Sequence, residues 1–241
     1  MIEQISDIGN IREQNEDSYG VIEETKYNLF LICDGMGGAN AGDVASHLAK
    51  EAIMETVRKN LLSEKPEMTL KKAFYCANEV IFEKAEEDSE KKGMGTTVTC
   101  ALSYENSLYV AHVGDSVLFQ IRNGNIFKLT KDHSYVQELV DLGKIDENEA
   151  KHHPNKNIIT RAVGTARGLK IDQFKLKIEK DDIYLLCTDG LTDYLSDEEI
   201  LEQILSHDNH KETLESLARI AKERGGKDNI TLLLFGGEAL K

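Results

Sequence analysis

Four runs of apolar residues in this chain each lie next to an aspartate. The runs are "LFLIC" before Asp34, "LYVAHVG" before Asp115, "IYLLCT" before Asp189 and "NITLLLF" after Asp228. Apolar runs of this length, bounded by turn residues, are typical of buried β-strands. Strand ends of a packed sheet can converge, so the sequence predicts that these carboxylates gather in one place.

Carboxylates that gather repel one another, and each resists ionisation beside its neighbours. A hard divalent cation removes that repulsion, and an all-oxygen ligand set favours magnesium, manganese or calcium. The cysteines are widely separated and form no CxxC pair, which argues against zinc and fits a reduced compartment. For any one aspartate, an ordinary strand-terminating turn is the competing interpretation, since Asp-Gly is a common turn pair.

The order of the expected elements indicates an α+β fold, because strands come in groups and so do helices. Two long helices are expected from apolar residues that recur every four positions, with Pro66 in the connection between them. Asn123-Gly124 predicts a type I′ hairpin turn. The segment from about 133 to 168 is mixed and polar, with two or three short helices at most. The expected strands are 2–8, 18–23, 27–33, 95–104, 107–115, 116–129, 172–178, 182–190 and 229–235, and the expected helices are 41–62, 69–90, 197–206 and 211–224.

Composition bounds the class of protein. The chain has 241 residues, which suits one large domain, or at most two. Its net charge of -14 and pI of about 5.0 argue against binding to nucleic acid or anionic membranes, which require an excess of Lys and Arg. The N-terminus has neither the basic nor the apolar region of a signal peptide, and no apolar stretch approaches the roughly 20 residues of a membrane span. We therefore expect a soluble, cytoplasmic protein without membrane insertion.

Eight motifs occur in order along nearly the whole chain. They are "SDIGNIREQNEDSYG", "LICDGMGG", "GTTVTCAL", "AHVGDSVLFQIRNG", "LTKDHS", "ITRAVG", "LLCTDGLTDYLSDEEI" and "KDNITLLLF". Together they resemble the metal-dependent serine/threonine protein phosphatases of the PPM type, in particular the small single-domain bacterial members. The resemblance implies a four-layer α-β-β-α sandwich, in which two antiparallel sheets are flanked by helix pairs. It also implies one catalytic domain over residues 1–241, with a flap-like insert at about 133–168.

The same resemblance assigns roles to individual residues. It implies two Mn²⁺ or Mg²⁺ ions, with a third in a weaker site. It further implies that a water shared by the two ions attacks the phosphorus of phosphoserine or phosphothreonine directly. The implied metal ligands are Asp34 bridging both ions, the Gly35 carbonyl, Asp189, Asp228 and, for the third ion, Asp115. The implied phosphate-binding residue is Arg12, whose planar guanidinium matches phosphate oxygens, and the implied residues that order metal-bound water are Glu16, Asp17 and, more weakly, Asp193.

Met36 departs from the pattern of many eukaryotic members, which have histidine in "DGHGG". A thioether carries no acidic proton, so Met36 cannot protonate the leaving group, and a metal-bound water is the alternative. We interpret His133, His152 and His153 as structural or exposed histidines. Thr96 and Thr97 are expected to belong to a strand. Arg161 is expected to be structural, paired with an acid, and Gly37 and Gly38 are expected to leave room for a ligand.

Two other functions compete with a protein phosphatase. A metal-dependent hydrolase of small phosphate esters or nucleotides would need the same acids, although "CDGMG" lacks the DxDxT nucleophile motif of haloacid-dehalogenase phosphatases. A module that binds phosphoproteins without cleaving them would be expected to lack a ligand acid, and none is missing. The implied partners are phosphorylated proteins, in particular a serine/threonine kinase and its substrates, and we expect a monomer.

Overall fold

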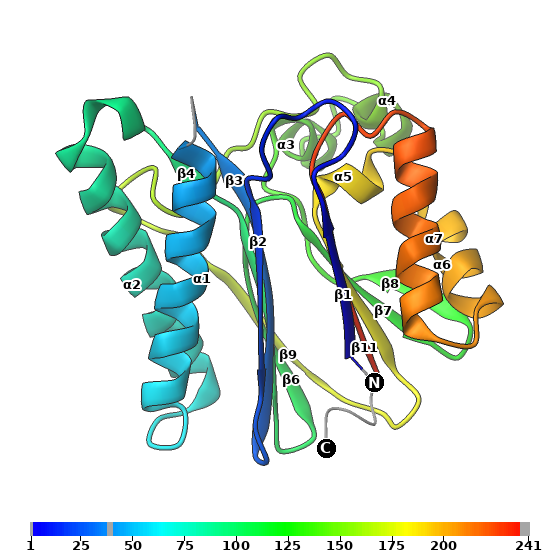
Figure 1. Ribbon diagram of the computed structural model, residues 1–241, viewed down its shortest axis with the longest axis horizontal. Coiled ribbons are helices and arrows are strands. Elements are labelled where there is room, and N and C mark those ends of the chain that lie inside the picture. Colours follow the sequence, from blue (N-terminus) through cyan, green and yellow to red (C-terminus); the bar gives the residue numbers. More distant parts are fainter. Residues whose placement is uncertain (1, 38–40, 237–241) are drawn as a thin grey trace.

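The computed structural model describes residues 2–37 and 41–236. Its strands form two antiparallel sheets that pack face to face (Figure 1). Sheet A has the order β1-β11-β10-β7-β8, and sheet B has the order β2-β3-β5-β6-β9, with β4 paired to β3. Sheet A consists of β1 (Ile2–Asp7), β11 (Ile230–Gly236), β10 (Ile183–Cys187), β7 (Val117–Arg122) and β8 (Asn125–Lys128). Sheet B consists of β2 (Asp17–Glu23), β3 (Tyr27–Met36), β4 (Gly95–Thr96), β5 (Val98–Tyr104), β6 (Ser107–Val113) and β9 (Asp172–Lys177).

Helices cover the outer face of each sheet, which confirms the predicted four-layer α-β-β-α sandwich. The long helices α1 (Ala41–Asn60) and α2 (Pro66–Glu87) lie on sheet B, followed by the 3₁₀ turn η1 (Ser89–Lys91). The helices α5 (Asp189–Thr192), α6 (Asp197–Ser206) and α7 (His210–Glu223) lie on sheet A. Two further short helices, α3 (Tyr135–Asp141) and α4 (Glu147–Lys151), lie between β8 and β9 in the chain.

Three buried clusters hold these layers together. One fills the space between sheet B and the α1/α2 pair, and a second lies between sheet A and α5, α6 and α7. The third lies between the sheets, where the rings of Phe30 and Phe235 stack with centroids 3.9 Å apart. Burial of apolar area on both faces of each sheet is the main stabilising contribution. It also fixes the strand register, because a slip by one residue would turn the apolar side chains away from the core.

Local signals explain most element boundaries. The Asn123-Gly124 turn has positive φ at both residues, 53° and 72°, which confirms the predicted hairpin. Helix α6 starts with a capping box between Ser196 and Glu199. Pro66 was placed wrongly by the sequence interpretation: it is the first residue of α2, not part of the connection. A proline fits this position because the first turn of a helix does not use that N–H.

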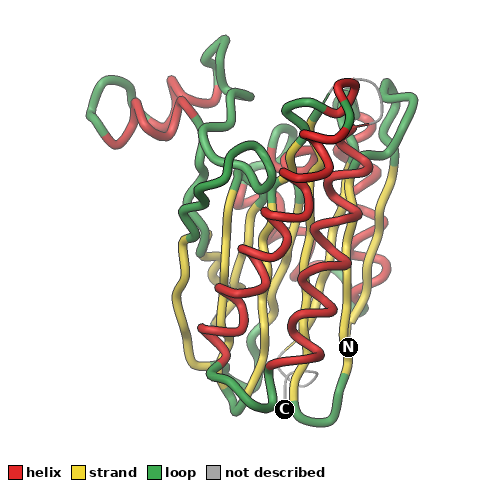
Figure 2. Tube along the Cα trace, turned by 90° about the vertical axis from the view of Figure 1, so that its left-hand side faces the viewer, coloured by secondary structure: helices red, strands yellow, loops and turns green. Residues whose placement is uncertain are grey.

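The segment between β8 and β9 contains two short helices, as expected. Figure 1 places α3 and α4 beyond the strand ends, beside α5, and Figure 2 shows short helices and loops that project past the ends of the strands. None of the helices in the described parts of the chain, 2–37 and 41–236, is long and apolar enough to cross a bilayer.

Candidate active site

Asp34 lies inside strand β3, whereas the sequence predicted that it follows the end of this strand. Strand β3 continues to Met36 because Gly35 and Met36 pair with β4. The Asp34 N–H donates to Thr97 Oγ1 at 2.9 Å, and the Thr96 hydroxyl donates to the Asp34 carbonyl at 2.8 Å. Thr96 belongs to β4, as predicted, whereas Thr97 lies between β4 and β5. Both threonines hold the backbone of Asp34 in place.

Gly35 lies where the start of α1 meets the loop before β2. A Cβ at Gly35 would overlap the carbonyl oxygens of Gly42 and Glu16, so only glycine fits this close approach. The Glu16 carboxylate in turn accepts a hydrogen bond from the Gly42 N–H. These contacts bring β3, α1 and the Glu16 backbone together at one end of the sandwich. Of the glycines after Asp34, Gly38 lies outside the described residues.

The acids predicted to converge influence one another strongly. Burial, then the nearby charges of Asp17, Asp189, Asp115 and Asp228, raise the pKa of Asp34 well above its ordinary range. Burial and repulsion from Asp228 raise the pKa of Asp189 to about 7, although a hydrogen bond between the Asp34 and Asp189 carboxyl groups opposes that rise. The acids come from both sheets, so the convergence results from the packing of the sandwich.

Asp17 joins the two sheets at this point. It begins β2 in sheet B, directly opposite Asp34 in the register. Its Oδ2 accepts a hydrogen bond from the Thr188 hydroxyl at 3.0 Å, at the end of β10 in sheet A. Burial raises the pKa of Asp17 to about 7 despite this hydrogen bond.

Three carboxylate oxygens in this region are buried without a hydrogen-bond partner among the described residues, namely Asp17 Oδ1, Asp115 Oδ1 and Asp189 Oδ1. A buried polar atom without a partner is costly, and clustered acids with raised pKa values indicate a functional site. Residues 2–37 and 41–236 contain no three His, Cys, Asp or Glu side chains already arranged around one point as metal ligands. The hard, all-oxygen donor set and the unsatisfied oxygens nevertheless fit divalent cations that take oxygen ligands.

Arg12 lies on the exposed loop between β1 and β2. Its Nη2 donates to Asp228 Oδ2 at 2.8 Å, and its Nη1 lies 3.9 Å from Glu16 Oε2. The hydrogen bond to Asp228 raises the pKa of the guanidinium, which therefore stays charged. Five N–H donors are available on an arginine, so these contacts leave donors for an anion.

Asp115 and Asp193 lie toward the α3–α4 segment. Burial and repulsion from Asp189 and Asp132 raise the pKa of Asp115 above its ordinary range. Asp193, at the end of α5, is exposed, and Lys156 Nζ lies 2.7 Å from its Oδ1. This ion pair joins the 133–168 segment to the acid cluster.

The histidines lie where structural residues are expected. His133 is buried, and its ring accepts a hydrogen bond from the Gly114 N–H at 3.0 Å. Arg161 contacts His133 and pairs with Asp172 at 2.9 Å, which confirms that it is paired with an acid. His152 and His153 make local contacts within their own segment.

Sequence reasoning missed Thr188, Asp132 and Asn229. Thr188 and Asn229 directly adjoin predicted ligands, and that adjacency is the signal that could have identified them. Asp132 follows a lysine in a polar loop, and only the packing of that loop brings it close to Asp115.

Comparisons with known proteins find similar sequences and similar folds. Serine/threonine phosphatase stp of Listeria innocua is 37% identical over 233 residues, which cover 95% of this chain and 92% of that protein. The crystal structure of serine/threonine phosphatase Stp1 from Staphylococcus aureus superposes with a TM-score of 0.92 at 36% identity, covering 98% of this chain and 94% of that one. The catalytic domain of the serine/threonine protein phosphatase PstP, solved in complex with two manganese ions, gives a TM-score of 0.86 at 35% identity, covering 97% and 96%. The family described as protein phosphatase 2C matches residues 11–234, and with relatives this similar over nearly its full length, the chain belongs to that family.

Proposed function

We propose that this chain is a metal-dependent protein phosphatase that hydrolyses phosphoserine and phosphothreonine esters in proteins. The observation that carries the proposal is the convergence of Asp34, Asp189 and Asp228, from both sheets, beside the exposed guanidinium of Arg12. The two-manganese complex of PstP supports the same chemistry in a relative of the same fold.

We assign the ligand roles to acids of this cluster and to the carbonyl of Gly35, which follows Asp34 in β3. Asp34 would bridge two Mn²⁺ or Mg²⁺ ions, with the Gly35 carbonyl on one ion and Asp189 and Asp228 on the other. Asp115 would hold a third, weaker ion. When bound, such ions activate a water for in-line attack on phosphorus and stabilise the charge that develops there.

The remaining roles belong to side chains of the chain itself. Arg12 binds the phosphate with the donors that Asp228 and Glu16 leave free. Asp17 and Glu16 accept hydrogen bonds from waters near the acids, and Asp193 does so at the rim. Met36 has no acidic proton, so the leaving alkoxide takes its proton from water.

We further propose that residues 1–241 act as one catalytic domain in which 133–168 forms a flap beside the acids. The Lys156–Asp193 ion pair and the position of α3 and α4 beyond the strand ends support this role. The relatives' activities suggest phosphorylated proteins as substrates. A serine/threonine kinase and its targets are the partners we propose, with the chain acting as a cytoplasmic monomer.

The test compares a phosphothreonine peptide, p-nitrophenyl phosphate and a nucleotide as substrates, with Mn²⁺ and with excess chelator. We expect Mn²⁺-dependent release of phosphate with a clear preference for the phosphopeptide. Asp34→Ala should abolish turnover while the fold, monitored by circular dichroism, persists. Turnover that survives chelation would overturn the metal mechanism, and a preference for nucleotides would favour the small-ester hydrolase instead.

A further inference from the structure

Asn229 connects the segment that carries Arg12 to Asp228, the residue directly before Asn229 in the chain. Its side chain is 4% exposed. Nδ2 donates to the carbonyls of Ile8 and Gln14, both at 3.0 Å, and Oδ1 accepts from the Glu16 N–H at 2.8 Å. All three hydrogen bonds of the amide therefore go to the backbone of one segment, residues 8–16.

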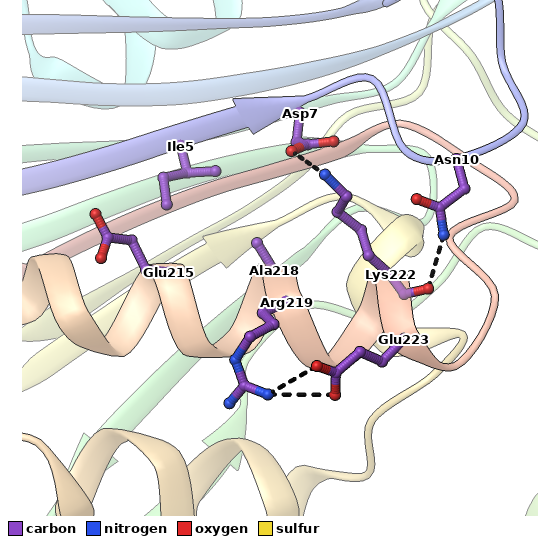
Figure 3. A pocket seen from close by; sticks show the side chains of 8 residues that line it. All are labelled: Ile5, Asp7, Asn10, Glu215, Ala218, Arg219, Lys222 and Glu223. Carbon is purple, nitrogen blue, oxygen red and sulfur yellow. Dashed lines mark hydrogen bonds and ion pairs between the residues drawn. The ribbon is translucent and has the colours of Figure 1, made fainter.

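Asn10 forms a second connection between the same two parts of the chain. Its N–H donates to the Gly226 carbonyl at 2.7 Å, and its Nδ2 donates to the carbonyls of Lys222 at 2.7 Å and Gly225 at 3.0 Å. Figure 3 shows Asn10 reaching the end of α7, in a groove of about 540 Å³ between β1 and α7. The Asp7–Lys222 ion pair, at 2.8 Å, also lines this groove.

In the sequence, Arg12 lies between Asn10 and Gln14, which are the nearest residues held by these hydrogen bonds. Residues 11–14 are exposed, so packing contributes little to the position of this turn. A long arginine side chain on such a turn can place its guanidinium reproducibly only if the backbone beneath it is fixed. The hydrogen bonds of Asn229 and Asn10 supply that restraint, and they do so relative to Asp228.

We propose that Asn229, aided by Asn10, is a positioning residue that holds the Arg12 segment at a fixed spacing from Asp228. This inference rests on the proposed function, because it assumes that Arg12 binds the substrate phosphate. Asn229 touches neither substrate nor metal in this scheme. It acts through Arg12, by keeping the phosphate-binding group in register with the acid cluster.

Hydrogen exchange of the metal-free protein tests the restraint without reference to activity. In Asn229→Ala, amides of residues 8–16 should exchange faster, and the Glu16 N–H in particular should lose protection because its acceptor is gone. If Asn229→Ala fails to fold, Asn10→Ala, at an exposed position, should give a smaller effect in the same segment. Unchanged exchange in residues 8–16 in both variants would overturn the proposal.

Asn78 provides a matched control on the other side of the molecule. It is 3% exposed, and like Asn229 it donates to two carbonyls, those of Ala166 and Arg167, and accepts from one N–H, that of Gly164. Asn78→Ala should therefore lower the free energy of unfolding about as much as Asn229→Ala does. It should leave amide exchange in residues 8–16 close to wild type, because its hydrogen bonds go to residues 164–167 instead.

Steady-state kinetics with a phosphothreonine peptide separate positioning from general destabilisation. We expect Asn229→Ala to lower kcat/KM by about 100-fold, the loss that a misplacement of about 1 Å can cause, and mainly by raising KM. In an Arg12→Ala background, Asn229→Ala should lower kcat/KM almost no further, because Asn229 acts only through Arg12. Additive losses in this double-mutant cycle would contradict the proposal.

The two ideas can fail separately. If wild-type protein shows no metal-dependent phosphatase activity, the proposed function fails, while the exchange measurements still report whether Asn229 restrains residues 8–16. If wild type is active but the double-mutant cycle is additive, the proposed function survives and the positioning role of Asn229 is refuted.

Discussion

Replacement of Asp189 by asparagine should change the stability of the protein in a direction that depends on metal. Without metal, the variant should be more stable than wild type, and with metal it should be less stable than wild type. Asp189 begins α5 beside Asp34, and burial together with repulsion from Asp228 raises its pKa to about 7. One of its carboxylate oxygens is buried with no hydrogen-bond partner in the described part of the chain. An amide at this position keeps the shape of the side chain and removes the charge that its neighbours repel.

The expected magnitude follows from linkage. A pKa of about 7 in the folded state, against an ordinary 3.8, corresponds to about 4 kcal/mol at about 1.4 kcal/mol for each pH unit. The side chain is only half-buried and Asp34 shares the repulsion, so we expect about half of that, roughly 2 kcal/mol. For a chain of this size that corresponds to a rise in Tm of about 6 °C.

The pH dependence has a defined sign. Because the folded pKa lies above the unfolded one, protonated Asp189 favours the folded state, and that stability is fully present below about pH 4. It is lost as the pH rises to about 7. The advantage of Asp189→Asn over wild type should therefore be small near pH 4 and reach its full size above about pH 7.

Manganese should reverse the order of stability. An ion held by the proposed ligands binds the folded state only, and it adds about 2.7 kcal/mol when its concentration is a hundred times Kd. Asp189→Asn lacks one of those ligands and should gain much less. At about pH 8, therefore, the variant should unfold at higher temperature than wild type in chelator and at lower temperature in Mn²⁺.

Thermal unfolding followed by circular dichroism, at about pH 5 and about pH 8 with chelator or Mn²⁺, measures all of these differences. Asp182→Asn is the control, since Asp182 is a buried aspartate that is fully paired: it accepts 2.6 Å hydrogen bonds from Arg122 Nε and Nη2. That substitution should destabilise the protein in every buffer, because it breaks a paired charge. If Asp189→Asn without metal at high pH proves as destabilising as Asp182→Asn, the inferred repulsion between the acids does not exist.

Three further outcomes follow from contacts around the site. Gly35→Ala should lower the free energy of unfolding by about 3 kcal/mol, because the new Cβ would overlap the backbone oxygen of Gly42. Urea denaturation measures this loss, and a urea midpoint equal to that of wild type would show that α1 can move away. Arg12→Lys should raise KM for a phosphopeptide by about tenfold, since one charge-assisted hydrogen bond is lost, and an unchanged KM would remove Arg12 from the phosphate site. Lys156→Ala should speed amide exchange around its own segment while changing the free energy of unfolding by less than about 1 kcal/mol, because its ion pair with Asp193 is partly exposed. Unaltered exchange would mean that this pair does not hold the segment.

Much of the fold could be predicted from periodicity. The apolar spacing of α1 and the Asn123-Gly124 turn are local signals, and both elements appear where they were expected. Periodicity failed where a tertiary contact decides the boundary. Strand β3 runs past Asp34 only because β4 pairs with it, and β4 is too short to have a pattern of its own.

The residues of the candidate site also fall into two groups, those that a local sequence pattern predicts and those that only tertiary packing brings to the site. Asp34 and Asp189 could be identified because each stands at the end of an apolar run, which is a local pattern. Asp132 and the Thr188–Asp17 hydrogen bond could not, since they depend on how a polar loop and two sheets pack against each other. The residues that support the acids are therefore harder to predict than the acids themselves.

The threonines show why the supporting residues matter to the argument about metal. Carboxylates that repel one another, as Asp34 and its four acidic neighbours do, would move apart if their backbones were free to do so. At Asp34 the backbone is restrained on both sides, by the Thr97 hydroxyl at its N–H and by the Thr96 hydroxyl at its carbonyl. At Asp17 the Thr188 hydroxyl restrains the side chain itself. The repulsion is thus retained in the folded state and appears as raised pKa values instead of displaced strands. Such a fold gives up stability without metal, and the same free energy becomes available to favour cation binding.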